Sequence, residues 1–216
     1  MVRRTFVIVA AVAGIALLAP ERIGAQLASR PAAEWMKTLE SPERVASLQI
    51  DTVIARLNLK PGDVVADLGA GSGVFAFPLA KAVGPGRVYA VELDEGFLTH
   101  IRARAQAENV KNVVAVNGKF TDPSLPARDV DVAFFHDVLH HVENRSAYIK
   151  SVTGYVKPGG RIVVIEFNPA DSPHKDQPEL VVSREQTAAW MADAGFVPAE
   201  DISVFKDKWF VVYRRK

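Results

Sequence analysis

The stretch VVADLGAGSGVFAFPLA, from Val64 to Ala80, decides the fold of this chain. A short apolar run contains Asp67 near its end and is followed at once by Gly69, Gly71 and Gly73. Glycine lets the backbone bend sharply and lets a ligand approach without meeting a Cβ. A helical pattern follows, and the N–H groups that open such a helix favour an electronegative ligand group. The stretch therefore predicts a strand, a ligand-binding turn and a helix.

Beyond this stretch, apolar runs of strand length alternate with helical patterns. The predicted strands are Val64–Leu68, Arg87–Glu92, Val113–Val116, Val130–Phe135 and Arg161–Phe167. The predicted helices between them cover about Val74–Val83, Glu95–Glu108 and Asn144–Val156. Almost uniformly apolar strands separated by helices indicate a parallel sheet that is buried on both faces.

The C-terminal part follows a different pattern. Ser183-Arg184-Glu185-Gln186 is a capping-box start for a helix that ends near Gly195. Two strands follow, about Val197–Phe205 and Trp209–Arg214, and their short separation predicts an antiparallel hairpin. The predicted fold class is thus α/β, with a doubly wound, mostly parallel seven-stranded sheet of Rossmann-like type and a C-terminal antiparallel β-hairpin.

The first 30 residues differ from the rest. Arg3 and Arg4 precede an apolar run from Phe6 to Ala19 and then small residues, which is the layout of a secretory signal peptide. As a helix this run covers about 21 Å, short of the roughly 30 Å hydrocarbon core of a bilayer. We therefore expect an exported protein, periplasmic or membrane-anchored, and a cytoplasmic one if the segment is not a functional signal. Membrane association is expected only through this segment.

Three regions are predicted along the chain. Residues 1–25 are a signal peptide or N-terminal anchor, residues 26–60 a helical N-terminal segment, and residues 61–216 the α/β domain. Ser41-Pro42 is a helix-start signal inside the second region.

Composition excludes several classes of function. The chain has 216 residues, a formal net charge of +1 and no cysteine. A near-neutral chain gives no reason to expect a nucleic-acid partner. Without cysteine there are no disulfides, thiolate metal sites or cysteine nucleophiles. The oligomeric state is not indicated.

Two cofactor classes compete for the glycine loop. Gly71, Gly73 and Ala76, with Glu92 about twenty residues later, formally match a dinucleotide-binding fingerprint. That match places its first glycine four residues beyond Asp67, late for a turn that begins where the strand ends. Alternating glycines behind an acid better suit a ligand that carries an ammonium group and no pyrophosphate.

Four segments resemble the class I S-adenosylmethionine-dependent methyltransferases. VADLGAGSG is similar to their first motif, VYAVELD to their second strand, DVAFFHDVLHHV to their fourth-strand motif, and VKPGGRIVVIEF to the turn and fifth strand. They cover about Asp63 to Phe167 in the order and spacing of that family. The resemblance implies an enzyme that transfers a methyl group from S-adenosyl-L-methionine to an unidentified acceptor, expected to be a small molecule.

The resemblance implies a substrate lid in residues 26–60, where Trp35, Met36 and Arg44 are candidate contacts and are equally plausible as packing or surface residues. It also implies residue roles in the sheet. Asp67 would orient the loop and the cofactor's amino group, Glu92 would accept hydrogen bonds from both ribose hydroxyls, and Leu93 would pack on the adenine. The cofactor-binding set is Asp67, Gly69, Gly71, Gly73, Glu92, Leu93, Lys119, Phe120, Asp122 and His136. Lys119 stands where many members carry an acid that reads the adenine amino group, so Asp122 is the nearest substitute. Because Asp122 precedes Pro123, a plain turn role is the alternative.

His136, Asp137, His140 and His141 lie within six residues. On a helical turn His136 and His140 would share a face and could bind a metal. A third ligand would have to come from elsewhere, so we predict no metal site and expect such histidines to line a polar pocket or cap a helix. His140 and Asp137 are the candidate catalytic residues, as general bases for an acceptor that must lose a proton.

Two other functions stay open at this point. An exported, non-catalytic protein could keep the fold and even the cofactor pocket, because S-adenosylmethionine is made in the cytosol. A nicotinamide-dependent oxidoreductase rests on the formal fingerprint alone.

Overall fold

The computed structural model describes residues 31–216. The predicted signal peptide or anchor lies outside the described residues. Over the range 31–216, every helix falls short of the length and apolar character needed to cross a membrane.

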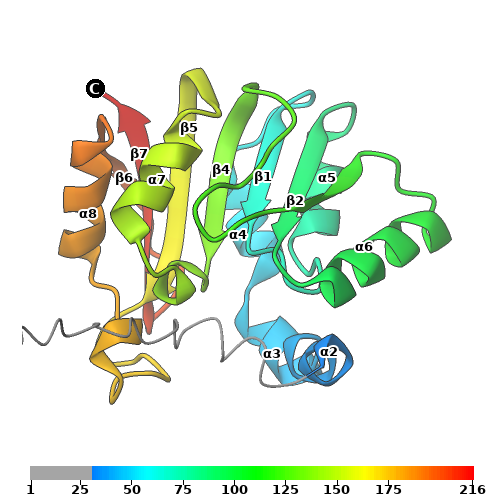
Figure 1. Ribbon diagram of the computed structural model, residues 1–216, viewed down its shortest axis with the longest axis horizontal. Helices are drawn as coiled ribbons and strands as arrows, with labels where there is room; N and C mark the ends of the chain where they lie inside the picture. Colours follow the sequence, from blue (N-terminus) through cyan, green and yellow to red (C-terminus); the bar gives the residue numbers. More distant parts are fainter. Residues whose placement is uncertain (1–30) are drawn as a thin grey trace, which may run out of the picture.

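The centre of the fold is a seven-stranded sheet in the order β3-β2-β1-β4-β5-β7-β6 (Figure 1). Strands β1 to β5 pair in parallel, whereas β7 is antiparallel to both β5 and β6. The strands are β1 (Val64–Leu68), β2 (Arg87–Glu92), β3 (Val113–Asn117), β4 (Val130–His136), β5 (Val156–Phe167), β6 (Phe196–Asp201) and β7 (Lys208–Arg215). The predicted doubly wound sheet with its C-terminal antiparallel hairpin is confirmed.

Helices cover both faces of the sheet. One face packs against α7 and α8, whose Ile149, Val152 and Met191 are fully buried there. The other face packs against α4, α5 and α6, which contribute residues such as Leu79 and Ile101. The α-helices are α2 (Ala32–Leu39), α3 (Pro42–Ser47), α4 (Ile50–Leu57), α5 (Ala76–Val83), α6 (Glu95–Ala107), α7 (Arg145–Thr153) and α8 (Arg184–Asp193), with short 3-10 helices η1 (Leu139–His141) and η2 (Pro178–Leu180). Burial on both faces explains why the strands are apolar at consecutive positions.

The predicted helix starts are present. The Ser41 hydroxyl accepts a hydrogen bond from the Arg44 amide, with proline in the first turn of α3. Ser183 and Gln186 form the complete capping box that opens α8. Both caps satisfy amide groups that have no partner inside the helix.

Several predicted boundaries were wrong. The helical pattern after Ser41 is divided into α3 and α4, because Gln49 takes the left-handed conformation with φ 47°. Strand β5 begins at Val156, five residues before the predicted Arg161, and α7 correspondingly ends at Thr153. Strand β6 ends at Asp201, so Phe205 lies outside it.

The arrangement positions one edge of the sheet for ligand binding. Strand order reverses between β1 and β4, and in open α/β sheets ligands bind at the carboxyl ends of the strands beside such a reversal. Figure 1 shows α2 and α3 at the lower edge of the sheet, with the segment after β5, in orange, at the same edge.

Candidate ligand-binding site

A cavity of about 540 Å³ lies at the carboxyl ends of β1, β2 and β4. This volume falls in the range of about 300–1,000 Å³ that is usual for small-molecule sites. The apolar part of its lining includes Trp35 and Leu39 of α2, Leu93, Phe120 and Phe167. Polar groups from the loops after β1, β2 and β4 converge on the same space. The cavity thus has the composition of a pocket for an organic ligand with a few polar groups.

The glycine loop is fixed between two neighbouring segments. The amides of Gly69 and Ala70 both donate to the Val91 carbonyl of β2, each at 2.9 Å. Gly69 has φ +75°, and a Cβ on it would lie 2.2 Å from Cγ2 of Val138. A glycine is therefore required at position 69 by both its backbone conformation and the contact with the loop after β4. This contact, rather than ligand approach alone, explains that glycine.

Asp67 stands at the base of the cavity with one oxygen unsatisfied. Only 4% of the residue is exposed, and among residues 31–216 its Oδ2 is buried without a hydrogen-bond partner. Burial, and secondarily the charge of Glu92, raises the pKa of Asp67 to about 7. A buried carboxylate without a partner is costly. An ammonium group bound in the cavity would satisfy this oxygen, so the residue fits a cationic amino ligand.

Glu92 closes the loop from the end of β2. Its Oε2 accepts from the Gly71 amide at 2.9 Å, and its Oε1 accepts from the amides of Leu93 at 2.6 Å and Asp94 at 3.3 Å. Burial raises its pKa, although these amide hydrogen bonds act in the opposite direction. A carboxylate offers about four acceptor sites, so these three bonds leave one site, on Oε2. Glu92 therefore holds the loop and keeps one acceptor site for a hydroxyl donor.

Most of the remaining predicted cofactor residues also line the cavity. Leu93, Lys119, Phe120 and His136 do so, and Phe120 is 55% exposed. Gly73 does not line it. A Cβ on Gly73 would meet Phe77 and Ile101 of the neighbouring helices at 3.1 and 3.2 Å.

Asp122 lies away from the cavity. Its carboxylate accepts hydrogen bonds from the Ser151 hydroxyl at 2.6 Å, the Tyr155 hydroxyl at 2.9 Å and the Ser124 amide at 2.6 Å. Burial alone would raise the pKa of Asp122, but these bonds and the charge of Lys119 together lower it. The structure thus gives Asp122 the turn role and does not place it for the suggested contact with adenine. The carboxylate fastens its loop to α7 and to the residue preceding β5.

Asp137 is engaged in a buried ion pair. Its carboxylate Oδ2 bonds to Nζ of Lys208, and both side chains are at most 5% exposed. Burial alone would raise the pKa of Asp137, but His136, Lys208 and Arg44 together lower it. Nδ1 of His136 lies 3.4 Å from the same Oδ2 atom, and burial lowers the pKa of His136 to about 4. A carboxylate held in this way is a poor proton acceptor, so the geometry does not favour Asp137 as a base.

His140 is oriented by a buried acid. Its Nδ1 lies 2.9 Å from Oε1 of Glu166, which is only 2% exposed, and its amide donates to Oε2 of the same carboxylate at 3.3 Å. With Nδ1 as donor, Nε2 carries the lone pair. His140 also lines the cavity. Of the two predicted catalytic residues, His140 has the geometry of an oriented base or ligand.

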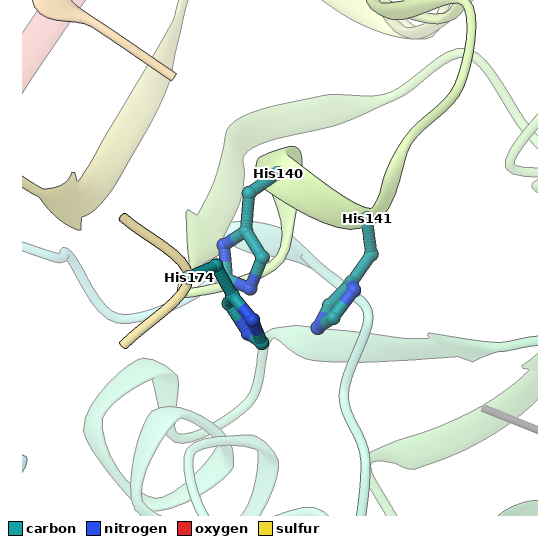
Figure 2. A group of neighbouring side chains, drawn as sticks. All are labelled: His140, His141 and His174. Atoms are coloured by element: carbon teal, nitrogen blue, oxygen red, sulfur yellow. The ribbon is translucent and has the colours of Figure 1, made fainter. Parts of the chain in front are cut away.

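The structure does not place His136 and His140 on one face, as a helical turn would have done. His136 ends β4 and packs against Phe75 at 4.6 Å between ring centroids, whereas His140 lies in η1. The left-handed conformation of Asp137, φ 53°, turns the chain between them. The ring of His140 instead lies 4.1 Å from that of His141 and 5.2 Å from that of His174 (Figure 2).

Three residues of the site were not predicted from the sequence. Lys208 is 71 positions from Asp137, Glu166 is 26 positions from His140, and His174 lies after β5 in a segment with no motif. Lys208 could have been noticed as a basic residue at the start of a buried strand, and Glu166 as an acid inside the apolar run VVIEF. His174 had no local signal.

A family model described as "Methyltransferase domain" matches residues 66–164. This range includes the glycine loop, Glu92 and η1. A C-methyltransferase of ubiquinone and menaquinone biosynthesis from Burkholderia orbicola is 32% identical over 143 residues, which are 65% of this chain and 57% of that protein. A demethylmenaquinone methyltransferase from Geobacillus kaustophilus is 28% identical over 54% of this chain and 50% of its own length. The chain spans about half the length of the curated relatives that it matches.

Solved structures share the fold over most of the chain. A S-adenosylmethionine-dependent methyltransferase from Aquifex aeolicus superposes with a TM-score of 0.76 at 24% identity, covering 83% of this chain and 96% of its own. A magnesium protoporphyrin IX methyltransferase from Synechocystis, solved with bound S-adenosylhomocysteine, has a TM-score of 0.66 at 21% identity and covers 85% and 93%. At this identity the likeness concerns the fold.

Proposed function

This chain contains a class I S-adenosylmethionine-dependent methyltransferase domain, and on that premise we propose that it transfers a methyl group from S-adenosylmethionine to a small-molecule acceptor. S-adenosylmethionine supplies, when bound, a methyl group already activated on a sulfonium. The observation that carries the proposal is the unsatisfied buried oxygen of Asp67 beside the clamped glycine loop.

The residues of this chain divide the binding work. Asp67 accepts from the amino group, and its pKa of about 7 falls when that cation is present, so the bound state holds the carboxyl ionised. Glu92 accepts from a ribose hydroxyl with the acceptor site that Oε2 keeps. Leu93 and Phe120 offer apolar surface to the adenine, next to Lys119.

The part of the cavity lining beyond the cofactor residues supports a small-molecule acceptor. Phe167, Pro173, Tyr148 and the histidines of η1 belong to it, which suits an apolar or aromatic acceptor with a polar atom. The two relatives named above for quinone biosynthesis and the neighbour named for a porphyrin point in the same direction by their names. His140, oriented by Glu166, is the residue that we propose acts on the acceptor's polar atom.

Calorimetric titration of the full chain with S-adenosylmethionine and S-adenosylhomocysteine tests the cofactor, with NAD as the negative control. Replacing Glu92 by Ala should weaken both sulfur ligands by about 10–150-fold, equivalent to about 1.5–3 kcal/mol of hydrogen bonding. Glu92→Gln keeps the shape of the side chain and should lie between Glu92→Ala and the parent. Glu95→Ala removes an exposed acid three residues away, which pairs with Arg102, and should leave the affinity unchanged.

Binding of NAD in place of the sulfur ligands, or no binding by a folded parent chain, would refute the cofactor assignment. Once binding is established, release of S-adenosylhomocysteine with candidate phenols, hydroxyl compounds and quinols would report turnover. A chain that binds the cofactor but turns over none of a broad panel would favour the non-catalytic alternative.

A further inference from the structure

Three histidine rings converge at the acceptor end of the cavity. His140 and His141 come from η1, His174 comes from the loop after β5, and Figure 2 shows the three rings gathered around one point. One ring nitrogen of each lies within 4.8 Å of the others. The third ligand, which the sequence around η1 does not supply, is therefore brought by a segment more than thirty positions away.

The first of these histidines has the support that metal ligands usually have. Glu166 fixes the ring of His140 through Nδ1 and leaves Nε2 for a further partner. A ligating histidine almost always donates its other N–H to a carboxylate or carbonyl, which fixes the ring and raises its basicity. Glu166 is itself held by the amides of His140 and Phe167, at 3.3 and 3.1 Å.

The second histidine has a ring nitrogen that no neighbouring group among residues 31–216 occupies. Within the described part of the chain, Nδ1 of His141 is buried and has no hydrogen-bond partner. A buried imidazole nitrogen without a hydrogen-bond partner is available as a metal ligand.

The segments that carry the three rings are tied together. Arg145 donates from Nη2 to the His140 carbonyl at 2.8 Å and to the Glu179 carbonyl at 2.5 Å, which joins η1 to η2. The Ser172 hydroxyl accepts from the His174 amide at 3.1 Å and shapes the turn that presents this ring. The cluster is thus a fixed arrangement rather than a chance approach of side chains.

We propose that His140, His141 and His174 bind one divalent transition metal ion of the Zn²⁺ class, with a coordination position open to the cavity. Zinc binds histidine nitrogen at about 2.0–2.1 Å in tetrahedral geometry, which places the nitrogens about 3.3 Å apart, so rotation of the side chains closes the set. Three histidines and an open position form the donor set of a catalytic rather than a structural zinc site. The sequence alone predicted no metal, since it offered two histidines on one helical face and no third ligand beside them.

The open position defines the class of acceptor. A metal ion there binds an oxygen atom and lowers the pKa of a hydroxyl, which then releases its proton to solvent. This consequence rests on the proposed function, whereas metal binding itself does not. The ligand class is accordingly a phenol, an enol or another hydroxyl compound.

The test uses the full chain without an affinity tag, stripped with a chelator and titrated with Zn²⁺ by calorimetry and with Co²⁺ by visible absorption. One ion per chain is expected, with ligand-field bands of tetrahedral or five-coordinate Co²⁺. His174→Ala, in a surface loop, should weaken Zn²⁺ binding at least about 100-fold, and Glu166→Gln about 10–100-fold. The matched control is His100→Ala, which removes a histidine of α6 that is paired with Glu40. This variant should bind Zn²⁺ like the parent.

Two results overturn the proposal: a folded parent chain that binds no Zn²⁺, or a His174→Ala chain that binds it as the parent does. Titration of the same samples with S-adenosylmethionine separates failure of the metal site from failure of the proposed function. The cofactor residues Asp67 and Glu92 lie on β1 and β2, away from the three histidines in sequence. If Zn²⁺ does not bind while the cofactor does, His140 is left as a general base.

Discussion

Replacing Asp67 by Asn should make the ligand-free fold more stable and cofactor binding weaker. The folded-state pKa of Asp67 is about 7, against an ordinary value of 3.8. The folded chain therefore holds the proton more tightly than the unfolded chain, and its stability falls as the pH rises from about 4 to about 7. At about 1.4 kcal/mol for each pKa unit, the ionised carboxyl costs the fold about 4 kcal/mol near pH 7.5.

An asparagine removes that cost but introduces amide donors without partners, at about 1–3 kcal/mol. The free energy of unfolding of Asp67→Asn should thus exceed that of the parent by about 1–3 kcal/mol at pH 7.5. The difference between the two chains should shrink by about 2–3 kcal/mol at pH 5, where the parent carboxyl is mostly protonated. Urea denaturation at both pH values measures this difference.

The same substitution should weaken S-adenosylmethionine by about 10–150-fold, because the ammonium group loses a charged partner. Asp63→Asn, which changes an acid just before β1 that bonds to the Lys60 amide, controls for the exchange and should bind the cofactor normally. A stability difference that does not vary between pH 5 and pH 7.5 would refute the reasoning about burial. Unchanged cofactor affinity would refute the role of Asp67.

Two further substitutions probe the frame of the site. Lys208→Met leaves the Asp137 carboxylate buried without its cation and should lower the free energy of unfolding by about 3–5 kcal/mol, as judged by thermal denaturation; adding Asp137→Asn should recover part of the loss, and no recovery would contradict the ion-pair explanation. Gly69→Ala forces a Cβ to within 2.2 Å of Val138 at φ +75° and should destabilise the chain by several kcal/mol, on the order of a severe core substitution. Val138→Ala should relieve only the steric part, so full rescue would argue against backbone strain.

The sheet could be predicted because its signals are local. Strands β1 and β2 end where predicted, at Leu68 and Glu92, since a buried parallel strand is a short apolar run between turn residues. The capping box at Ser183 predicted α8 through bonds that span three residues. By contrast, the break at Gln49 has no such signal, because no glycine or proline marks the left-handed conformation that this residue takes.

The candidate site was predictable on its cofactor side and much less so on its acceptor side. Asp67 and Glu92 lie among the last two residues of β1 and β2, the glycines follow β1, and topology alone brings these strand ends together. Asp122 was misplaced because its partners, Ser151 and Tyr155, come from α7 and the residue preceding β5.

The sequence by itself determined the order of strands and helices, the glycine loop and the acids that border it. Those features arise from periodicity, turn chemistry and backbone freedom among near neighbours in the chain. Only the tertiary structure decided that Lys208 neutralises Asp137 and that His174 joins His140 and His141. Such partners are set by strand register and loop packing, which bring together groups that are far apart in the chain and share no local pattern.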